Sequence, residues 1–263
     1  MDAARPQVVV SNDDGISEPG IDVLARLLGE WADCIVIAPA EPQSGVGHAL
    51  SDGRELRVHT QSPHRIAVAG TPADCARLAF APGSPLLQAW SEPCVYPSRW
   101  LVAGINHGAN LGVDTYVSGT AAAAREAAIL GFPAIAISHY VGRHRTIDWA
   151  EAQRHARPIL QELFTRPPAP GAFWNVNLPH PHRVTPECPV VFCPPDPSPH
   201  PIRYERRENT FRYSGDYHAR PRRPGCDVDV CLGGAIAVSE VQLFGPGTLS
   251  APSERSRSEK IDD

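Results

Sequence analysis

The sequence predicts an α/β fold, in which a Rossmann-like, mostly parallel sheet flanked by helices is followed by a C-terminal β-rich arm. In the first half, short apolar runs alternate with helical patterns, as in parallel sheets whose two faces are both covered. After about residue 167, proline-rich breakers separate the strands, which no longer alternate with helices. With 42% hydrophobic residues among 263, the chain can bury a sizeable core.

The elements of the first half follow from hydrophobic periodicity and helix-boundary residues. Apolar side chains from Ile21 to Trp31 recur at helical spacing, and Thr71, Pro72 and Asp74 form the start of a capped helix. Pro158 should kink or split the helix that contains it. The predicted strands are 8–11, 34–38, 56–60, 65–68, 100–105 and 134–138, and the predicted helices are 19–31, 71–80, 120–130 and 147–164.

The second half is expected to add a last sheet strand and an arm. Strands are predicted at 174–178, 190–193 and 235–244. We therefore divide the chain into a Rossmann-like catalytic domain (1–180), a β-rich oligomerisation arm with the last strands (181–245), and a disordered tail (246–263) that is rich in serine, proline and charge.

Composition excludes several kinds of chemistry. The formal net charge is −5, and Lys260 is the only lysine of the chain. Because this lysine stands in the predicted tail, the sequence excludes a Schiff base, a pyridoxal-phosphate site and a Walker phosphate loop. Each of these needs a lysine in its site. The mild acidity argues against binding to a nucleic-acid duplex, which favours a basic surface.

The N-terminus and the cysteines indicate a cytoplasmic protein without a membrane association. The first residues lack the pattern of a signal peptide, and no apolar run approaches the roughly 18 residues of a membrane span. Seven cysteines suit reduced thiols better than a disulfide framework. Cys188/Cys193 and Cys226/Cys231 lie in strand-like runs that put the two side chains of each pair on opposite faces, which favours packing thiols over zinc.

Three polar loops each follow a buried strand of the first half, at 12–15, 42–48 and 106–110. Because ligands of open parallel sheets bind at the carboxyl ends of the strands, these loops are expected to meet there. The adjacent carboxylates Asp13 and Asp14 either form a turn and cap the next helix or bind a cation. Ser44 and Asn106 add neutral oxygens, so the set favours one divalent cation, Mg²⁺ or Mn²⁺.

The segment Ser118-Gly119-Thr120 opens the alanine-rich helix. Ser118 can simply cap this helix, or the free N–H groups of the helix N-terminus can bind an anion. Two loop histidines, His48 and His107, either touch the ligand or are solvated.

These motifs together closely resemble the SurE family of survival-type nucleotidases. The resemblance is carried by VSNDDGISEPGIDVLARL, APAEPQSGVGHALS, GTPADCARLAF and AGINHGANLGVDTYVSGTAAAAREAAILGFPAIAIS, in the family's order, over residues 7–140. It implies an exchanged β-arm, a homodimer or homotetramer, and metal-dependent hydrolysis of nucleoside monophosphates. The implied metal ligands are Asp13, Asp14, Ser44 and Asn106, and the implied phosphate contacts are Gly45, Asn110, Ser118, Gly119 and Thr120.

The chain also departs from the family's LGDDVLYSGT pattern, with Val113 and Thr115-Tyr116-Val117 in place of the usual residues. These departures concern base preference and oligomer contacts, because the four metal ligands are unchanged.

We expect a metal-dependent phosphomonoesterase in which a metal-activated water attacks phosphorus, with Asp13 and Asp14 as catalytic residues. Asp13 as a general base and an aspartyl-phosphate path both remain open. The alternative is an oligomeric module that binds metal and nucleotide without turnover. A dinucleotide-dependent oxidoreductase is disfavoured, because acids stand where a GxGxxG turn would cradle a pyrophosphate.

Overall fold

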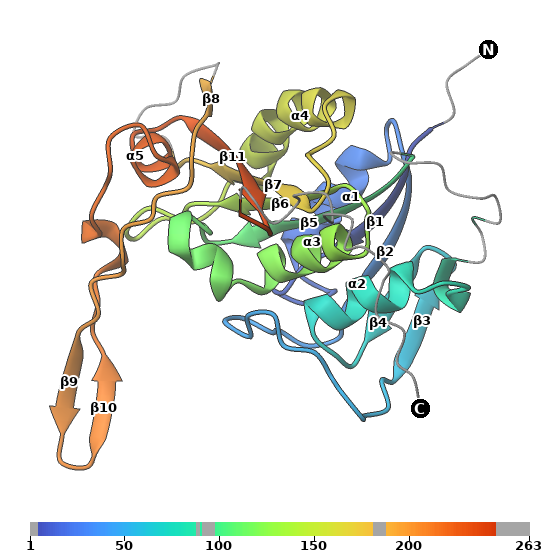
Figure 1. The fold of residues 1–263 in the computed structure, drawn as a ribbon, viewed down its shortest axis with the longest axis horizontal. Coiled ribbons are helices and arrows are strands. Elements are labelled where there is room, and N and C mark those ends of the chain that lie inside the picture. The colour runs from blue at the N-terminus through green and yellow to red at the C-terminus, as the bar shows by residue number, and fades with distance from the viewer. Residues whose placement is uncertain (1–4, 88–89, 91–97, 181–187, 246–263) are drawn as a thin grey trace, which may run out of the picture.

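The computed structural model describes residues 5–87, 90, 98–180 and 188–245 and has the α/β fold that the sequence predicts. In chain order, the strands of its main sheet are β1 Gln7–Ser11, β2 Asp33–Pro39, β3 Val58–Ser62, β4 Arg65–Val68, β5 Arg99–His107, β6 Ala134–His139, β7 Ala172–Leu178, β8 Val190–Phe192 and β11 Ile236–Gln242. Within the described residues, these nine strands are arranged in the order β3-β4-β2-β1-β5-β6-β7-β11-β8 (Figure 1). All neighbours from β4 to β7 are parallel, whereas β3 and β11 run antiparallel to β4 and β7.

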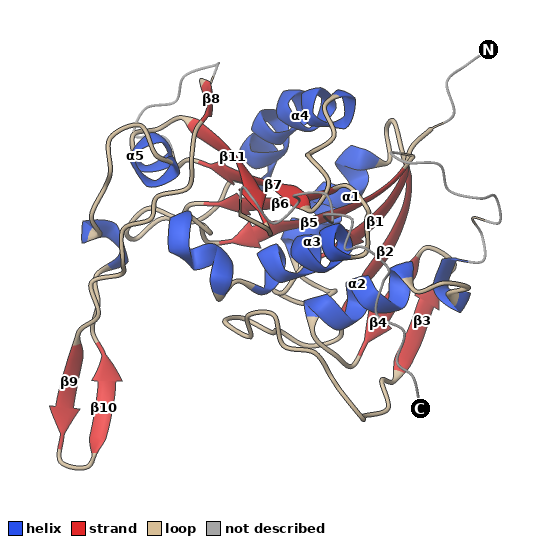
Figure 2. Ribbon diagram, in the orientation of Figure 1, coloured by secondary structure: helices blue, strands red, loops and turns tan. Residues whose placement is uncertain are grey.

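Helices cover both faces of this sheet, which explains why its central strands are mostly apolar (Figure 2). The helices are α1 Pro19–Leu28, α2 Pro72–Phe80, α3 Gly119–Ile129, α4 Trp149–Thr165 and α5 Asp227–Leu232. One core joins α1 and α4 to one face, and a second core joins α2 and α3 to the other. Val8 and Val9, adjacent in β1, belong to opposite cores, and both are fully buried.

Local sequence rules account for the start of α2. The Thr71 hydroxyl accepts a hydrogen bond from the Asp74 N–H at 3.1 Å, and the Asp74 carboxylate accepts one from the Thr71 N–H at 2.9 Å. This confirms the predicted capping box. Asp74 also accepts two hydrogen bonds from Ser51, so the cap fixes the end of the long loop that follows β2.

Two helix predictions need adjustment. Helix α1 ends at Leu28, and Trp31 lies beyond it while still packing against the core. Helix α4 runs unbroken through Pro158, so the prediction that this proline splits the helix is wrong. Pro158 is exposed, which lets water satisfy the carbonyl that its missing N–H leaves free.

The segment from Cys226 to Cys231 is not a strand, as the alternation predicted, but forms most of helix α5, with Cys226 at its N-cap. Val228, Cys231 and Leu232 are buried at helical spacing. The segment is too short for its periodicity to decide, and the contacts of Asp227 with the backbone of Gly112 and Asp196 hold it in place.

The C-terminal part extends the sheet and then leaves it. Strands β11 and β8 continue the main sheet, whereas β9 Tyr204–Arg207 and β10 Thr210–Tyr213 form a hairpin that projects from the body (Figure 1). The predicted tail at 246–263, with Lys260, lies outside the described residues. Within the described part of the chain, no helix has the length and apolar character needed to cross a membrane.

The strand order places a topological switch point between β1 and β5. From β1 the chain moves outward through β2, β3 and β4, then returns to the other side of β1 as β5. The carboxyl ends of β1, β2 and β5 therefore lie side by side, as the three polar loops required.

Candidate functional site

The acidic pair, Asp13 and Asp14, lies at the carboxyl end of β1. Asp13 is 5% exposed and Asp14 is partly buried. Desolvation by burial raises the pKa of Asp13, and it raises the pKa of Asp14 to about 6. The negative charge of Asp13 adds to the shift of Asp14.

Asp13 is held by the N-terminus of α3. The Thr120 hydroxyl donates a hydrogen bond to its Oδ1, and the Gly119 and Thr120 N–H groups also favour the charged form. A Cβ at Gly119 would lie 2.6 Å from the Asp13 Cβ, so only glycine permits this approach. The alternative in which Asp13 caps the following helix, α1, is therefore wrong: it binds at α3, a helix more than 100 residues away.

Backbone hydrogen bonds join the three loops. The His107 N–H at the end of β5 donates to Asp14 Oδ2 at 2.9 Å. The Gln43 N–H, in the loop after β2, donates to the Asp13 carbonyl at 2.7 Å. The predicted convergence of the loops is thus observed, and both contacts orient the acidic pair.

The neutral oxygens predicted as metal ligands lie in these same loops. Asn106 is 9% exposed, and its Nδ2 donates to the Gly108 carbonyl at 2.9 Å, which directs its Oδ1 the other way. Ser44 is exposed and follows Gln43 directly. Gly45 is exposed as well, and its φ of 73° suits a glycine in a tight loop.

Asn110, a predicted phosphate contact, belongs to a buried amide network. Its Nδ2 donates to Ser138 at 2.8 Å, and its N–H donates to Asn177 Oδ1 at 2.8 Å. Its carbonyl accepts from Asn175 and Asn177. The network fixes the loop after β5 to β6 and β7.

The segment Ser118–Thr120 caps α3, and two of its three predicted phosphate-binding residues contact a side chain of the protein itself. The Ser118 hydroxyl caps α3 by accepting from the Ala121 N–H at 3.0 Å. Within the described residues, this hydroxyl donates no hydrogen bond. Gly119 and Thr120 bind an anion at the helix N-terminus, and that anion is the Asp13 carboxylate.

Within the described residues, the acidic pair has no arginine or lysine partner, and the nearby His107 imidazole only partly offsets the rise in the pKa of Asp14. Among the ion pairs of the described residues, none includes Asp13 or Asp14. Within the same residues, Asp14 Oδ1 has no hydrogen-bond partner. Two partly desolvated carboxylates with a free oxygen, next to the loop that carries Asn106, are donors of the kind that fits a hard divalent cation.

Sequence reasoning missed the partners of His48. Its Nε2 lies 2.7 Å from Glu126, whose other carboxylate oxygen accepts from Arg77 Nε at 2.7 Å. Glu126 is fully buried in α3. An acidic residue among the alanines of α3 was the sequence feature that could have indicated this ion pair.

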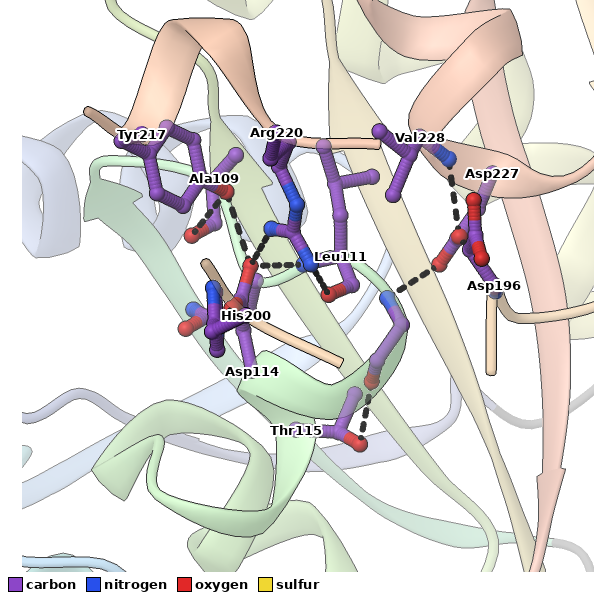
Figure 3. Close-up of polar contacts among 12 residues, drawn as sticks. Ala109, Leu111, Asp114, Thr115, Asp196, His200, Tyr217, Arg220, Asp227 and Val228 are labelled. Carbon is purple, nitrogen blue, oxygen red and sulfur yellow. Dashed lines mark hydrogen bonds and ion pairs between the residues drawn. The ribbon is translucent and has the colours of Figure 1, made fainter. Parts of the chain in front are cut away.

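A second buried acid, Asp114 in the 3-10 helix η2 (Gly112–Tyr116), was also missed. Its carboxylate accepts from Arg220 Nη1 at 2.6 Å and from the Tyr217 hydroxyl at 2.8 Å, and pairs with His200 at 2.5 Å (Figure 3). We call these four residues the Asp114 network. The Asp114 carbonyl also accepts from the Ser118 N–H, so the network connects the base of the arm to the start of α3.

Comparison with known proteins identifies the family. A family model described as survival protein SurE matches residues 8–192. A putative 5'-nucleotidase, alr3139, of Synechocystis sp. (strain ATCC 27184 / PCC 6803 / Kazusa) is 42% identical over 89% of this chain and 99% of its own length. A 5'-nucleotidase SurE of Heliobacterium modesticaldum (strain ATCC 51547 / Ice1) is 39% identical over 66% of this chain and 61% of its own. The crystal structure of the SurE protein from Aquifex aeolicus covers 92% of this chain and 95% of its own at a TM-score of 0.78 and 26% identity. The chain therefore belongs to the SurE family.

Proposed function

We propose that this protein is a metal-dependent nucleotidase that hydrolyses nucleoside monophosphates to nucleoside and phosphate. The observation that carries the proposal is the acidic pair without a cationic partner at the switch point of the sheet. Relatives that are named 5'-nucleotidases and are about 40% identical support the reaction class.

Asp13, Asp14, Ser44 and Asn106 would hold one divalent cation, Mg²⁺ or Mn²⁺. When bound, such a cation supplies positive charge to the substrate phosphate and lowers the pKa of a bound water. The described residues contain no lysine that could supply that charge in its place.

Residues of the chain itself orient the two acids and provide groups that can bind phosphate. Helix α3 and Thr120 hold Asp13 in one orientation. The His107 N–H holds Asp14 by Oδ2, which leaves Oδ1 to face the cation. The Ser118 hydroxyl and the Gly45 N–H, on the two loops that border the pair, are suited to bind phosphate oxygens.

The test is release of inorganic phosphate from AMP and GMP with Mn²⁺ or Mg²⁺ added, and again in EDTA. Activity should require the metal and should be lost in Asp14→Ala. Asp33→Ala is the matched control, because Asp33 is an exposed carboxylate paired with Arg5. Undiminished release in EDTA or in Asp14→Ala would contradict the proposal. Nucleotide binding without any phosphate release would favour the non-catalytic binding module.

The assembly and location of the protein also belong to this proposal. We propose a cytoplasmic homodimer or homotetramer in which the β9–β10 hairpin packs on another protomer. The exposed aromatic side chains of this hairpin, Tyr204, Phe211 and Tyr213, support that role.

A further inference from the structure

A pocket lined by basic side chains lies at the same edge of the sheet as the acidic pair. It has a volume of about 350 Å³ and is lined by Tyr140, Arg143, Arg145, His180, His218 and Arg222. We call these residues the basic pocket. In a chain with a net charge of −5, so many basic groups in one cavity are a local exception.

The fold builds this pocket from three separate segments. Arg143 and Arg145 lie in the turn after β6, where the Arg145 N–H donates to the Gly142 carbonyl at 3.2 Å. His180 follows β7 directly, and the Gly142 N–H donates to its Nδ1 at 3.4 Å. The base of the arm contributes His218, whose Nδ1 lies 2.7 Å from the Tyr140 hydroxyl.

At least one guanidinium group of the basic pocket has no carboxylate partner among the described residues. Arg143 forms an ion pair with Asp216. Arg222 lines the same cavity and has no carboxylate partner among the described residues. Arginine presents a planar set of N–H donors that matches a phosphate group, and a nearby histidine adds a further donor when protonated.

A short series of contacts connects the pocket to the acidic pair. The His107 N–H donates to Asp14, and His107 pairs with His139 across β5 and β6. The His139 ring lies 5.7 Å from the His180 ring, which faces the pocket. Since neighbouring strands are about 4.8 Å apart, the pocket at β6 and β7 lies on the order of 10 Å from the end of β5.

We propose that the basic pocket binds a phosphate group other than the one that the acidic pair cleaves. Because a single nucleoside can span the separation between the sites, the phosphate belongs either to a nucleotide with a second phosphate or to a separate phosphate ligand. The first case rests on the proposed nucleotidase function and extends its substrates to nucleoside bisphosphates.

The test compares adenosine 3′,5′-bisphosphate with AMP in the wild type and in Arg222→Ala. Arg222 should strengthen the binding of the bisphosphate only. Arg222→Ala should therefore raise the KM for the bisphosphate about tenfold and leave kcat and the KM for AMP unchanged. Arg222→Lys, which keeps the charge, should recover part of the affinity. Arg26→Ala, an exposed arginine in α1, is the control for net charge and should have no effect.

Calorimetric titration with the bisphosphate and with inorganic phosphate provides a readout that does not need turnover. If the protein releases no phosphate from any nucleotide, the nucleotidase proposal fails, whereas Arg222-dependent binding still supports the pocket. Inorganic phosphate that binds alongside AMP, and is lost in Arg222→Ala, identifies a separate ligand. The pocket proposal is overturned if Arg222→Ala weakens AMP and the bisphosphate equally, or weakens none of the three ligands.

Discussion

Two buried acidic sites in this protein differ in what neutralises them. Asp114 is surrounded by Arg220, His200 and Tyr217, and the Arg220 side chain is only 2% exposed. The acidic pair has backbone N–H groups and the Thr120 hydroxyl but no basic side chain in ion-pair contact within the described residues. Asp114 is neutralised by basic side chains of the chain itself and stabilises the fold. The acidic pair has no such partner, and this is the position where a cation from solution would bind.

Removing a carboxylate of the acidic pair should have the largest effect, and that effect should fall on activity. Asp14→Ala is expected to lower phosphate release from AMP at least about a thousandfold, because it removes a charged ligand of the cation. Its free energy of unfolding in EDTA should be no lower than that of the wild type. Steady-state kinetics and urea unfolding check the two statements, and a folded Asp14→Ala protein with wild-type turnover would contradict them.

Asp114→Ala should show the reverse pattern, with the loss in stability. The substitution leaves the buried Arg220 guanidinium without its carboxylate, at a cost of about 3–5 kcal/mol in the free energy of unfolding. Urea denaturation followed by circular dichroism measures this. The double variant Asp114→Leu/Arg220→Met should be more stable than Asp114→Ala, since it leaves no unpaired charge. If Asp114→Ala lowers the free energy of unfolding by less than an ordinary surface substitution does, the two acidic sites do not differ as described.

In metal-free protein, the free energy of unfolding should depend on pH through the ionisation of Asp14. Burial raises the pKa of Asp14 from 3.8 to about 6, so the folded state holds this proton more tightly than the unfolded state. Ionisation therefore disfavours the folded state, and the contribution of Asp14 to stability should fall as the pH rises from about 4 to 6, by at most about 3 kcal/mol.

The measurement is urea unfolding across this pH range in EDTA. The Asp14→Asn variant should lack this decline, because it has no proton to lose. Parallel curves for the wild type and Asp14→Asn would show that Asp14 is not desolvated as the structure describes.

Glu126 is an intermediate case and should give the smallest effect. It is buried, but the Arg77 side chain that pairs with it is 53% exposed, which lets solvent screen the interaction. Glu126→Gln keeps the shape and is expected to cost about 1–2 kcal/mol. Thermal or urea unfolding of this variant should place it between Asp33→Ala and Asp114→Ala. A larger loss than in Asp114→Ala would break the ranking.

The fold and the position of the site could be predicted because both depend on local patterns. The all-apolar run at Val8–Val10 and the boundary residues Thr71 and Asp74 are signals within a few residues of chain. The polar loops could be expected to meet, since strands of a parallel sheet end at a common edge.

What could not be predicted depends on contacts between distant residues. Asp13 and Thr120 are 107 positions apart, and Asp114 and Arg220 are 106 apart. The segment from Cys226 to Cys231 fits both strand and helix periodicity, and tertiary contacts decide between them. The basic pocket draws on the turn after β6, the end of β7 and the base of the arm, which no sequence pattern connects.

The central claim is that the acidic pair holds a divalent cation, and direct titration with Mn²⁺ tests it most simply. Calorimetry of metal-free protein should show one Mn²⁺ bound per chain in the wild type and in Asp33→Ala, and no binding at that site in Asp14→Ala. A wild type that binds no Mn²⁺, or an Asp14→Ala variant that binds it with the wild-type affinity, would contradict the account.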